Sequence, residues 1–304
     1  MILGINISHH PSICFYKNGK ITNFYNEERF LFNKDWIPTS NNFKVFKSIL
    51  EKVKEKPKFV CYSSYNRFEP FVDEDNRIIQ ILQNQLNNPN YFFDEKKHHL
   101  YHACAGFYFS PFTDAVAVIV DGGGSCNYKI PFRETESIYY INKKTLYPIY
   151  KHSSNKANQD FPTKEYEMIT NFTDGFENKF SQNSIGGWVF VEGCKKVGFK
   201  EQHAGKLMGL ASYGYCKNKY NLNYDHVQIA KEAQEKTFNE TCLLIDKAKK
   251  FSNNIILSGG YFLNCSNNFK YVKKYPNLNF FIDPIPHDGG TAIGVCYYYE
   301  HYHK

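Results

Sequence analysis

The chain has 304 residues with 42% hydrophobic and 17% aromatic side chains, enough for a sizeable core in two lobes or two small domains. No apolar run approaches the roughly 20 residues that a membrane span needs, and MILGINIS at the N-terminus is a strand pattern rather than a signal peptide. The nine cysteines form no CxxC pair, which predicts reduced thiols and a cytosolic (cytoplasmic) protein without membrane association, and argues against a zinc ribbon.

The formal net charge of +7 is compatible with a nucleic-acid partner, because Lys and Arg neutralise phosphates. Only four of the 37 basic residues are arginines, however, whereas guanidinium groups are the usual readers of base edges and phosphates. The arginines are Arg29, Arg67, Arg77 and Arg133. The abundance of Lys, Asn, Tyr, Phe and Ile also fits an AT-rich genome, so the charge alone does not indicate a nucleic-acid function.

Two similar strand units follow one another along the chain. In residues 2–28 an apolar strand ends in polar residues and precedes two strands joined at Asn18-Gly19, a strong hairpin signal. Residues 115–129 again run from an apolar strand into an Asp and three glycines, and residues 137–152 form a second strand pair with a polar turn at 142–145. The second unit therefore repeats the first.

The remaining elements complete this plan. Residues 253–272 predict a strand, a Gly-Gly turn and a helix, whose N-terminal N–H groups can hold an anion. Residues 226–251 predict a long amphipathic helix, read as a packing element, with Ile229, Ala233, Leu244 and Ala248 on or near one face. Residues 152–183 are interpreted as a surface insertion and 62–97 as irregular.

Duplicated hairpin units with glycine-rich strand ends look like the actin/sugar-kinase/Hsp70 (ASKHA) superfamily. The resemblance implies an α/β fold of two ribonuclease H-like lobes that face a cleft, lobe I at about 1–112 and lobe II at about 113–304.

Four residues suggest a metal site. On a helix His98 and His102 lie one turn apart on the same face, while His99 points about 100° away. Such a pair alone is more often incidental than metal-binding. Asp121 and Asp288 are each followed directly by a glycine turn. Two His with two Asp form a mixed nitrogen and oxygen site suited to iron, manganese or zinc. His287 is an alternative to one of these ligands.

Motifs in order along nearly the whole chain resemble the N-terminal domain of the NodU/CmcH-type O-carbamoyltransferases, relatives of the universal tRNA threonylcarbamoyl-adenosine transferase. They are SHHPS, NGKI, EERF, HHLYHACAGFYFSPF, VDGGG, SIGGWVFVEGCKKVGF, GKLMGLASYG, LSGGYFLNCSNN and DGGTAIG. The resemblance implies a metal, Fe2+ or else Mn2+ or Zn2+, on His98, His102, Asp121 and Asp288. It also implies that ATP-derived carbamoyl adenylate, with or without Mg2+, is bound by Arg29, Lys206, Gly259, Gly260, Asn264, Gly122, Gly123 and Gly289.

In this family a carbamoyl group passes from the adenylate to an alcohol oxygen. His9 occupies the position of the general base, for which a neutral imidazole is suited; the alternative is a turn histidine bonded to backbone. Lys34 matches a basic position that holds donor phosphate or carbamoyl oxygen; the alternative is a solvated surface lysine.

The chain departs from the family pattern in three respects. His10 stands where the family has Asp, so the group that orients His9 differs or is missing, and Ala204 replaces an acidic residue that bears on nucleotide or second-metal contacts. Typical members continue into a YrdC-like domain that forms the carbamoyl adenylate. We therefore expect this chain to carry the transfer module and to depend on a separate YrdC-like protein for its donor.

The sequence thus predicts a metal-dependent O-carbamoyltransferase. The acceptor is a hydroxyl compound, either a small molecule or a 5-hydroxymethyl pyrimidine of phage-type DNA. A tRNA threonylcarbamoyl-adenosine transferase-like enzyme and a non-catalytic, nucleotide-binding partner subunit are the alternatives.

Overall fold

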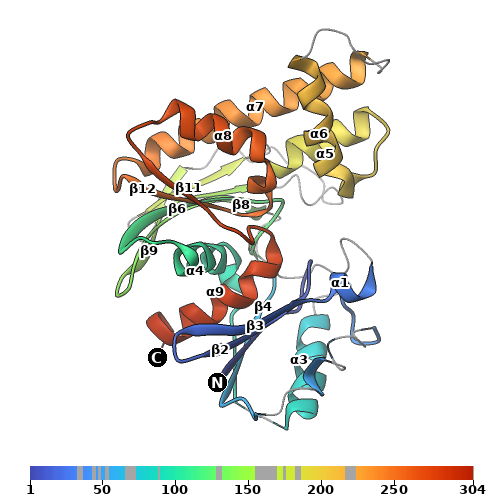
Figure 1. Ribbon diagram of the computed structural model, residues 1–304, viewed down its shortest axis with the longest axis vertical. Helices are drawn as coiled ribbons and strands as arrows, with labels where there is room; N and C mark the ends of the chain where they lie inside the picture. Colours follow the sequence, from blue (N-terminus) through green and yellow to red (C-terminus); the bar gives the residue numbers. More distant parts are fainter. Residues whose placement is uncertain are drawn as a thin grey trace.

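The structure is a computed structural model, and it describes most of the chain. The described residues are 1–32, 37–42, 46, 49–51, 55–65, 73–87, 90–127, 132–154, 170–173, 176–181, 186–215 and 224–303. They form two β-sheets with helices between them and on their outer faces (Figure 1).

The first sheet consists of a hairpin extended by two parallel strands. Its strands are β1 (Ile2–Asn6), β2 (Ser12–Lys17), β3 (Lys20–Asn26), β4 (Phe59–Ser63) and β5 (Tyr91–Phe93). β1 pairs antiparallel with β2 and parallel with β4, which gives the order β3-β2-β1-β4-β5. Asn18 and Gly19 turn between β2 and β3 with φ angles of 51° and 74°, the left-handed values of a tight hairpin, so the predicted hairpin is confirmed.

The second sheet repeats this topology. Its strands are β6 (Asp114–Val120), β7 (Cys126–Asn127), β8 (Phe132–Asn142), β9 (Leu146–Ser154), β10 (Thr170–Thr173), β11 (Phe176–Ser181), β12 (Asn254–Ser258) and β13 (Asn279–Ile282). β6 pairs antiparallel with β8 and parallel with β12, and the central order β9-β8-β6-β12-β13 corresponds strand for strand to the first sheet. The predicted fold of two duplicated lobes is therefore confirmed.

The helices cover both faces of the sheets. They are α1 (Glu28–Leu31), α3 (Glu74–Leu86), α4 (His98–Phe109), α5 (Gly187–Lys196), α6 (Ala204–Ala211), α7 (Tyr224–Ala248), α8 (Cys265–Lys274) and α9 (Thr291–Tyr298). α3 packs on the outer face of the first sheet, and α5, α7 and α8 cover the outer face of the second (Figure 1). α4 and α9 lie between the two sheets, where each joins an apolar cluster with a sheet.

The prediction of an irregular segment at 62–97 is wrong, whereas the interpretation of 152–183 as a surface insertion falls largely on residues outside those described. Within 62–97 the structure has the helix α3, which buries Ile78, Ile79 and Leu82 against the first sheet although most of its other residues are polar. Within 152–183, β9 extends to residue 154 and β11 adds to it in parallel. The sequence did not predict α3 and β11 because both are mostly polar. An element at the edge of a core needs only a few apolar contacts, so its composition can resemble that of a loop. The predicted long helix is confirmed as α7, with Ala233, Leu244 and Ala248 buried.

The contact between α4 and α9 brings distant parts of the chain together. Gly294 of α9 faces the backbone of Tyr101 so closely that a Cβ atom there would lie 1.8 Å from the Tyr101 carbonyl oxygen. α9, although C-terminal, also packs on β1 and β4 of the first sheet. The predicted lobe boundary near residue 112 stays a prediction.

No helix in the described part of the chain is both long enough and apolar enough to cross a membrane.

Candidate active site

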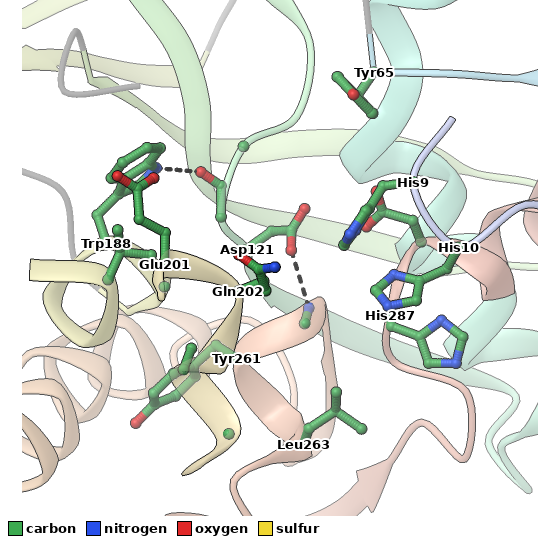
Figure 2. Close-up of a pocket in the computed structure, with 18 of the residues that line it drawn as sticks. His9, His10, Tyr65, Asp121, Trp188, Glu201, Gln202, Tyr261, Leu263 and His287 are labelled. Atoms are coloured by element: carbon green, nitrogen blue, oxygen red, sulfur yellow. Dashed lines mark hydrogen bonds between the residues drawn. The ribbon is translucent and has the colours of Figure 1, made fainter. Parts of the chain in front are cut away.

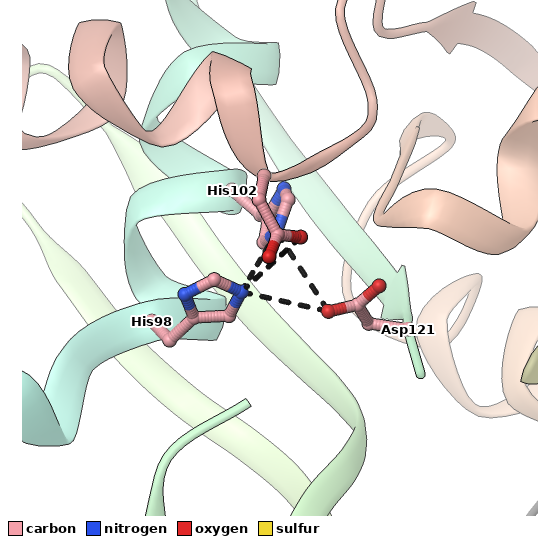
Figure 3. Close-up of side chains that lie close together, drawn as sticks. His98, His102 and Asp121 are labelled. Atoms are coloured by element: carbon pink, nitrogen blue, oxygen red, sulfur yellow. Dashed lines mark hydrogen bonds and ion pairs between the residues drawn. The ribbon is translucent and has the colours of Figure 1, made fainter. Parts of the chain in front are cut away.

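Four ionisable side chains converge at the N-terminal end of α4. His98 and His102 lie one helical turn apart on α4, Asp121 directly follows β6, and Asp288 begins the short turn before α9. Nε2 of His98 lies 3.5 Å from Oδ2 of Asp121 and 3.7 Å from Oδ1 of Asp288. Nε2 of His102 lies 4.0 Å and 3.8 Å from the same two oxygens (Figure 3). We call these four residues the HHDD cluster.

The HHDD cluster has the geometry of a cation site. One ligand atom from each of the four residues lies within 4.8 Å of the others, and all four side chains are buried. Ligand atoms bound about 2.1 Å from one ion lie roughly 3 to 4 Å apart, so small shifts would complete coordination. Two imidazoles with two carboxylates fit iron, manganese or zinc, and the residues present therefore suit the predicted metal.

The electrostatics of the HHDD cluster also favour a positive charge at its centre. Burial by itself lowers the pKa of His98, but the charges of Asp288 and Asp121 outweigh it and raise this pKa to about 10. Burial raises the pKa of Asp121, and hydrogen bonding and charge from the histidines more than reverse that effect and hold it far below its usual value. The carboxylates therefore stay ionised and attract a cation or a proton.

A glycine turn orients one of the carboxylates. Oδ1 of Asp121 accepts a hydrogen bond of 3.1 Å from the backbone N–H of Gly260, which leaves Oδ2 facing the histidines. Hydrogen bonding that fixes a ligand in this way is usual around bound metals.

Three further histidines form a wall beside the cluster. The ring of His10 lies 3.9 Å from that of His9 and 4.7 Å from that of His287, centroid to centroid. The side chain of Asn6 stabilises the loop that carries His9 and His10, because its amide N–H groups donate hydrogen bonds to the backbone carbonyls of both residues. Burial, followed by the neighbouring His10, lowers the pKa of His287 to about 3, and its Nδ1 accepts a hydrogen bond from the N–H of Gly289.

These groups border one cleft of about 600 Å³ (Figure 2). The histidine wall and Asp288 lie on one side, and Trp188, Val191 and Met208 contribute apolar surface. The remaining polar lining includes Glu201, Gln202 and Arg133, with Tyr65 and the glycines 122, 123 and 260. The cleft is thus lined by two carboxylates of the HHDD cluster, by imidazoles, and by both apolar and polar side chains further along its wall. This lining suits a substrate that extends well beyond the atoms that react.

The predicted site residues fall into three groups. His9, Gly122, Gly123 and Gly260 line the cleft together with Asp121 and Asp288, while Gly259 and Gly289 adjoin lining residues. Three residues do not line it in the described structure: Arg29 and Lys206 are exposed on α1 and α6, and Asn264 is buried. The Asn264 side chain caps α8 and forms two hydrogen bonds with the Gln234 side chain, at 2.8 and 2.9 Å. These bonds explain why Asn264 is buried between helices rather than exposed to the cleft. Lys34 lies outside the described residues.

The two residues that depart from the family pattern, His10 and Ala204, also line this cleft. His10 has a φ of 53°, which is uncommon for a residue other than glycine, and its Nε2 lies 3.9 Å from Glu28 Oε2. Ala204 begins α6 and lines the cleft.

Sequence reasoning missed several residues of the cleft, notably Arg133, Tyr65 and Trp188. Arg133 gave no usable signal, because it opens a run of polar residues, 133–137, at the start of β8. The other two gave none either, since aromatic residues are abundant throughout this chain.

The two duplicated sheets, with helices between them and on their outer faces, define a two-lobed α/β domain. Residues 45–243 match the family described as Carbamoyltransferase N-terminus. This match covers more than half of the chain, and the protein belongs to that family of transferase enzymes. No curated protein sequence matches the chain.

Solved structures show the same fold at low identity. Full-length HypF in its phosphate- and nucleotide-bound form is 13% identical, with a TM-score of 0.61 over 97% of this chain and 54% of HypF. HypF from T. kodakarensis is 11% identical over 97% of this chain and 46% of its own, with a TM-score of 0.50. The activator of the 2-hydroxyisocaproyl-CoA dehydratase from Clostridium difficile with bound ADPNP is 12% identical over 98% and 93%, also at 0.50. The chain therefore spans about half the length of the HypF structures.

Proposed function

We propose that this protein transfers a carbamoyl group from an ATP-derived carbamoyl adenylate to the hydroxyl group of an acceptor, with a divalent metal held by the HHDD cluster. The observation that carries the proposal is the convergence of His98, His102, Asp121 and Asp288 on one point of the cleft that His9 and two glycine turns also line. Membership of the carbamoyltransferase family supplies the reaction type.

In the proposed reaction the acceptor oxygen attacks the carbamoyl carbon. A bond from that oxygen to the carbon forms, the bond from the carbon to the phosphate oxygen breaks, and AMP leaves with the electron pair. The acceptor proton passes to a neutral imidazole, which we assign to His9 because it lines the cleft beside the HHDD cluster.

The chain's other groups bind and orient the reactants. We assign the leaving phosphate to the backbone N–H groups of Gly122 and Gly123, because both glycines line the cleft and none of the backbone hydrogen bonds between described residues uses these N–H groups. Trp188, Val191 and Met208 offer a surface for the adenine ring. A divalent cation, when bound, supplies Lewis-acid stabilisation of negative charge on the carbamoyl oxygen.

The test is a transfer assay that follows labelled carbamoyl into product. The purified chain is given carbamoyl phosphate, ATP and a set of hydroxyl acceptors, with and without a separate YrdC-like protein, so that the result does not depend on the source of the adenylate. We expect metal-dependent labelling of an acceptor in at least one arm. A metal-loaded, folded chain that labels no acceptor in either arm, yet binds AMP, would favour the nucleotide-binding partner instead.

A polyanionic acceptor is favoured by the surface next to the cleft. Leu263 lines the cleft, is 58% exposed and lies two residues before the start of α8. On α8 the Lys270 ammonium lies 4.7 Å from the ring of Tyr215, and the Lys273 ammonium lies 5.4 Å from the ring of the exposed Phe269. Cations interleaved with exposed aromatic rings suit a nucleic-acid strand.

This acceptor class has its own test. A single-stranded oligodeoxynucleotide containing 5-hydroxymethylcytosine is compared with the free nucleoside as acceptor at low and high salt. We expect a higher kcat/KM for the oligonucleotide and a loss of that advantage at high salt, because the contribution of phosphates is screened. Equal kcat/KM values at low salt would exclude a role for the α8 surface.

A further inference from the structure

One buried cation lines the cleft outside the HHDD cluster. Arg133 stands near the start of β8, is only 6% exposed and lines the cleft. Among the described lining residues it is the single Lys or Arg. A guanidinium held in a buried position at the wall of a cleft can bind an anion there strongly, because water screens its charge less than at an open surface.

The fold holds the Arg133 side chain at two points. Its stem crosses the glycine turn after β6, where a Cβ atom on Gly123 would lie 2.4 Å from Cδ of Arg133. The guanidinium carbon lies 5.0 Å from the ring centroid of Tyr65, just beyond β4 of the first sheet. One sheet therefore supplies the cation and the other supplies the aromatic face on which it rests.

This arrangement suits the recognition of an anion. A guanidinium stacked on an aromatic ring keeps the N–H groups at its edge for hydrogen bonding, and its planar fork matches the oxygens of a phosphate. The neighbouring Gly122 and Gly123 bring backbone N–H groups to the same part of the cleft.

We propose that Arg133 binds the phosphate group of the nucleotide donor and that Tyr65 positions its guanidinium. The inference rests on the proposed function for the identity of the donor, but the binding itself does not require transfer. Arg133 then selects a phosphorylated ligand over one that lacks the phosphate.

The experiment measures the binding of AMP and of adenosine by titration calorimetry to the full chain and its variants, with metal content and melting temperature recorded for each. Arg133→Met should weaken AMP binding about tenfold to a hundredfold and leave adenosine binding unchanged, because only AMP carries the phosphate. The affinity of Arg133→Lys for AMP should lie between those of the wild type and Arg133→Met, since lysine keeps the positive charge but lacks the planar set of N–H donors of a guanidinium. Arg77→Met, an exposed arginine on α3, is the matched control and should bind both ligands as the wild type does.

Tyr65 has a separate pair of variants. Tyr65→Phe keeps the aromatic face and should retain AMP binding, whereas Tyr65→Leu removes it and should weaken AMP binding severalfold.

Three results would overturn the inference: equal affinity of the wild type for AMP and adenosine, unchanged AMP affinity in folded Arg133→Lys and Arg133→Met, or an equal loss of both ligands, which indicates a structural role. An Arg133-dependent preference for AMP without any carbamoyl transfer would refute the proposed function and leave this inference standing.

Discussion

In the described part of the chain, the HHDD cluster and a second buried cluster of histidine and carboxylate differ in whether their hydrogen-bonding capacity is already used. The second cluster, on adjacent strands of the second sheet, consists of Glu136, His152 and Ser181. Nδ1 of His152 pairs with the Glu136 carboxylate, and its Nε2 lies 2.7 Å from the Ser181 hydroxyl. The hydroxyl of Thr135 donates to the same carboxylate at 2.7 Å. Each polar atom of the His152 ring is satisfied.

The HHDD cluster is open by comparison. The Nε2 atoms of His98 and His102 face each other at 3.2 Å, and two ionised carboxylates point at the same centre. Because Asp288 and Asp121 raise the pKa of His98 to about 10, a proton on this imidazole offsets part of the carboxylate charge when no metal is bound. The divalent cation that we propose for this cluster would replace that proton and use one ligand atom from each of the four residues.

The second cluster also has the residue types of a catalytic triad, but it does not have the position of one. Glu136, His152 and Ser181 follow the order of a carboxylate, histidine and serine triad, but none of the three lines the cleft that the structure describes, and all are buried. We interpret them as a hydrogen-bond network that joins three strands.

The largest expected effect is the loss of metal from the open cluster. Asp288→Ala should lower metal affinity by about a hundredfold or more and abolish transfer, because a four-ligand site loses one anionic ligand. Elemental analysis of the purified variant gives the metal content. His152→Gln is the control in the closed cluster and should keep full metal occupancy. Full occupancy in Asp288→Ala would show that the ligands are misassigned.

The next effect concerns the base beside the open cluster. His9→Asn should reduce turnover by roughly a hundredfold while the metal content and the melting temperature stay near wild type. Single-turnover rates with a preformed donor measure this step. Near-normal rates would move the role to His10 or to water.

A smaller effect is expected on the stability of the closed cluster. His152→Phe should lower the free energy of unfolding by about 1 to 3 kcal/mol, because it leaves the Glu136 carboxylate and the Ser181 hydroxyl buried without their partner. Urea unfolding measures the change. Ser181→Ala removes one hydroxyl and should cost less. Metal loss in His152→Phe without loss of stability would contradict the distinction between the two clusters.

The smallest effect is a pH dependence of stability from an ion pair near both clusters. Nζ of Lys151 lies 2.6 Å from Oε1 of Glu134. Burial raises the pKa of Glu134, but the charge of Lys151 more than offsets this and lowers it below its usual value. The pair therefore stabilises the fold above the unfolded-state pKa, near 4.3, and this contribution is lost as the pH falls through the lowered pKa.

Lys151→Met tests that pair. It removes the charge that keeps Glu134 ionised, so burial then raises the pKa of the carboxyl. The variant should be less stable than the wild type at pH 7, and the difference should shrink by about 1.4 kcal/mol for each pH unit as the pH falls from the raised pKa of Glu134 in the variant to its lowered pKa in the wild type. Unfolding curves between pH 3 and 7 give the comparison, and a constant difference would contradict the assigned cause.

Local patterns in the sequence determined the repeated architecture and half of the open cluster. Alternating apolar residues and glycine turns predicted both hairpin units, because strand periodicity and left-handed turns are set by neighbouring residues. The spacing of His98 and His102 was equally local, since residues four apart share one helix face.

Tertiary structure alone decided which distant side chains meet. Asp121 and Asp288 come together because α9 packs on α4 between the sheets, and Arg133 reaches Tyr65 because the two sheets face one cleft. The packing of α8 against α7 directed Asn264 into a buried amide network with Gln234, although its motif had predicted a place in the cleft. The direction of a side chain depends on strand register and on the neighbours that fill the space around it, and the local sequence carries neither.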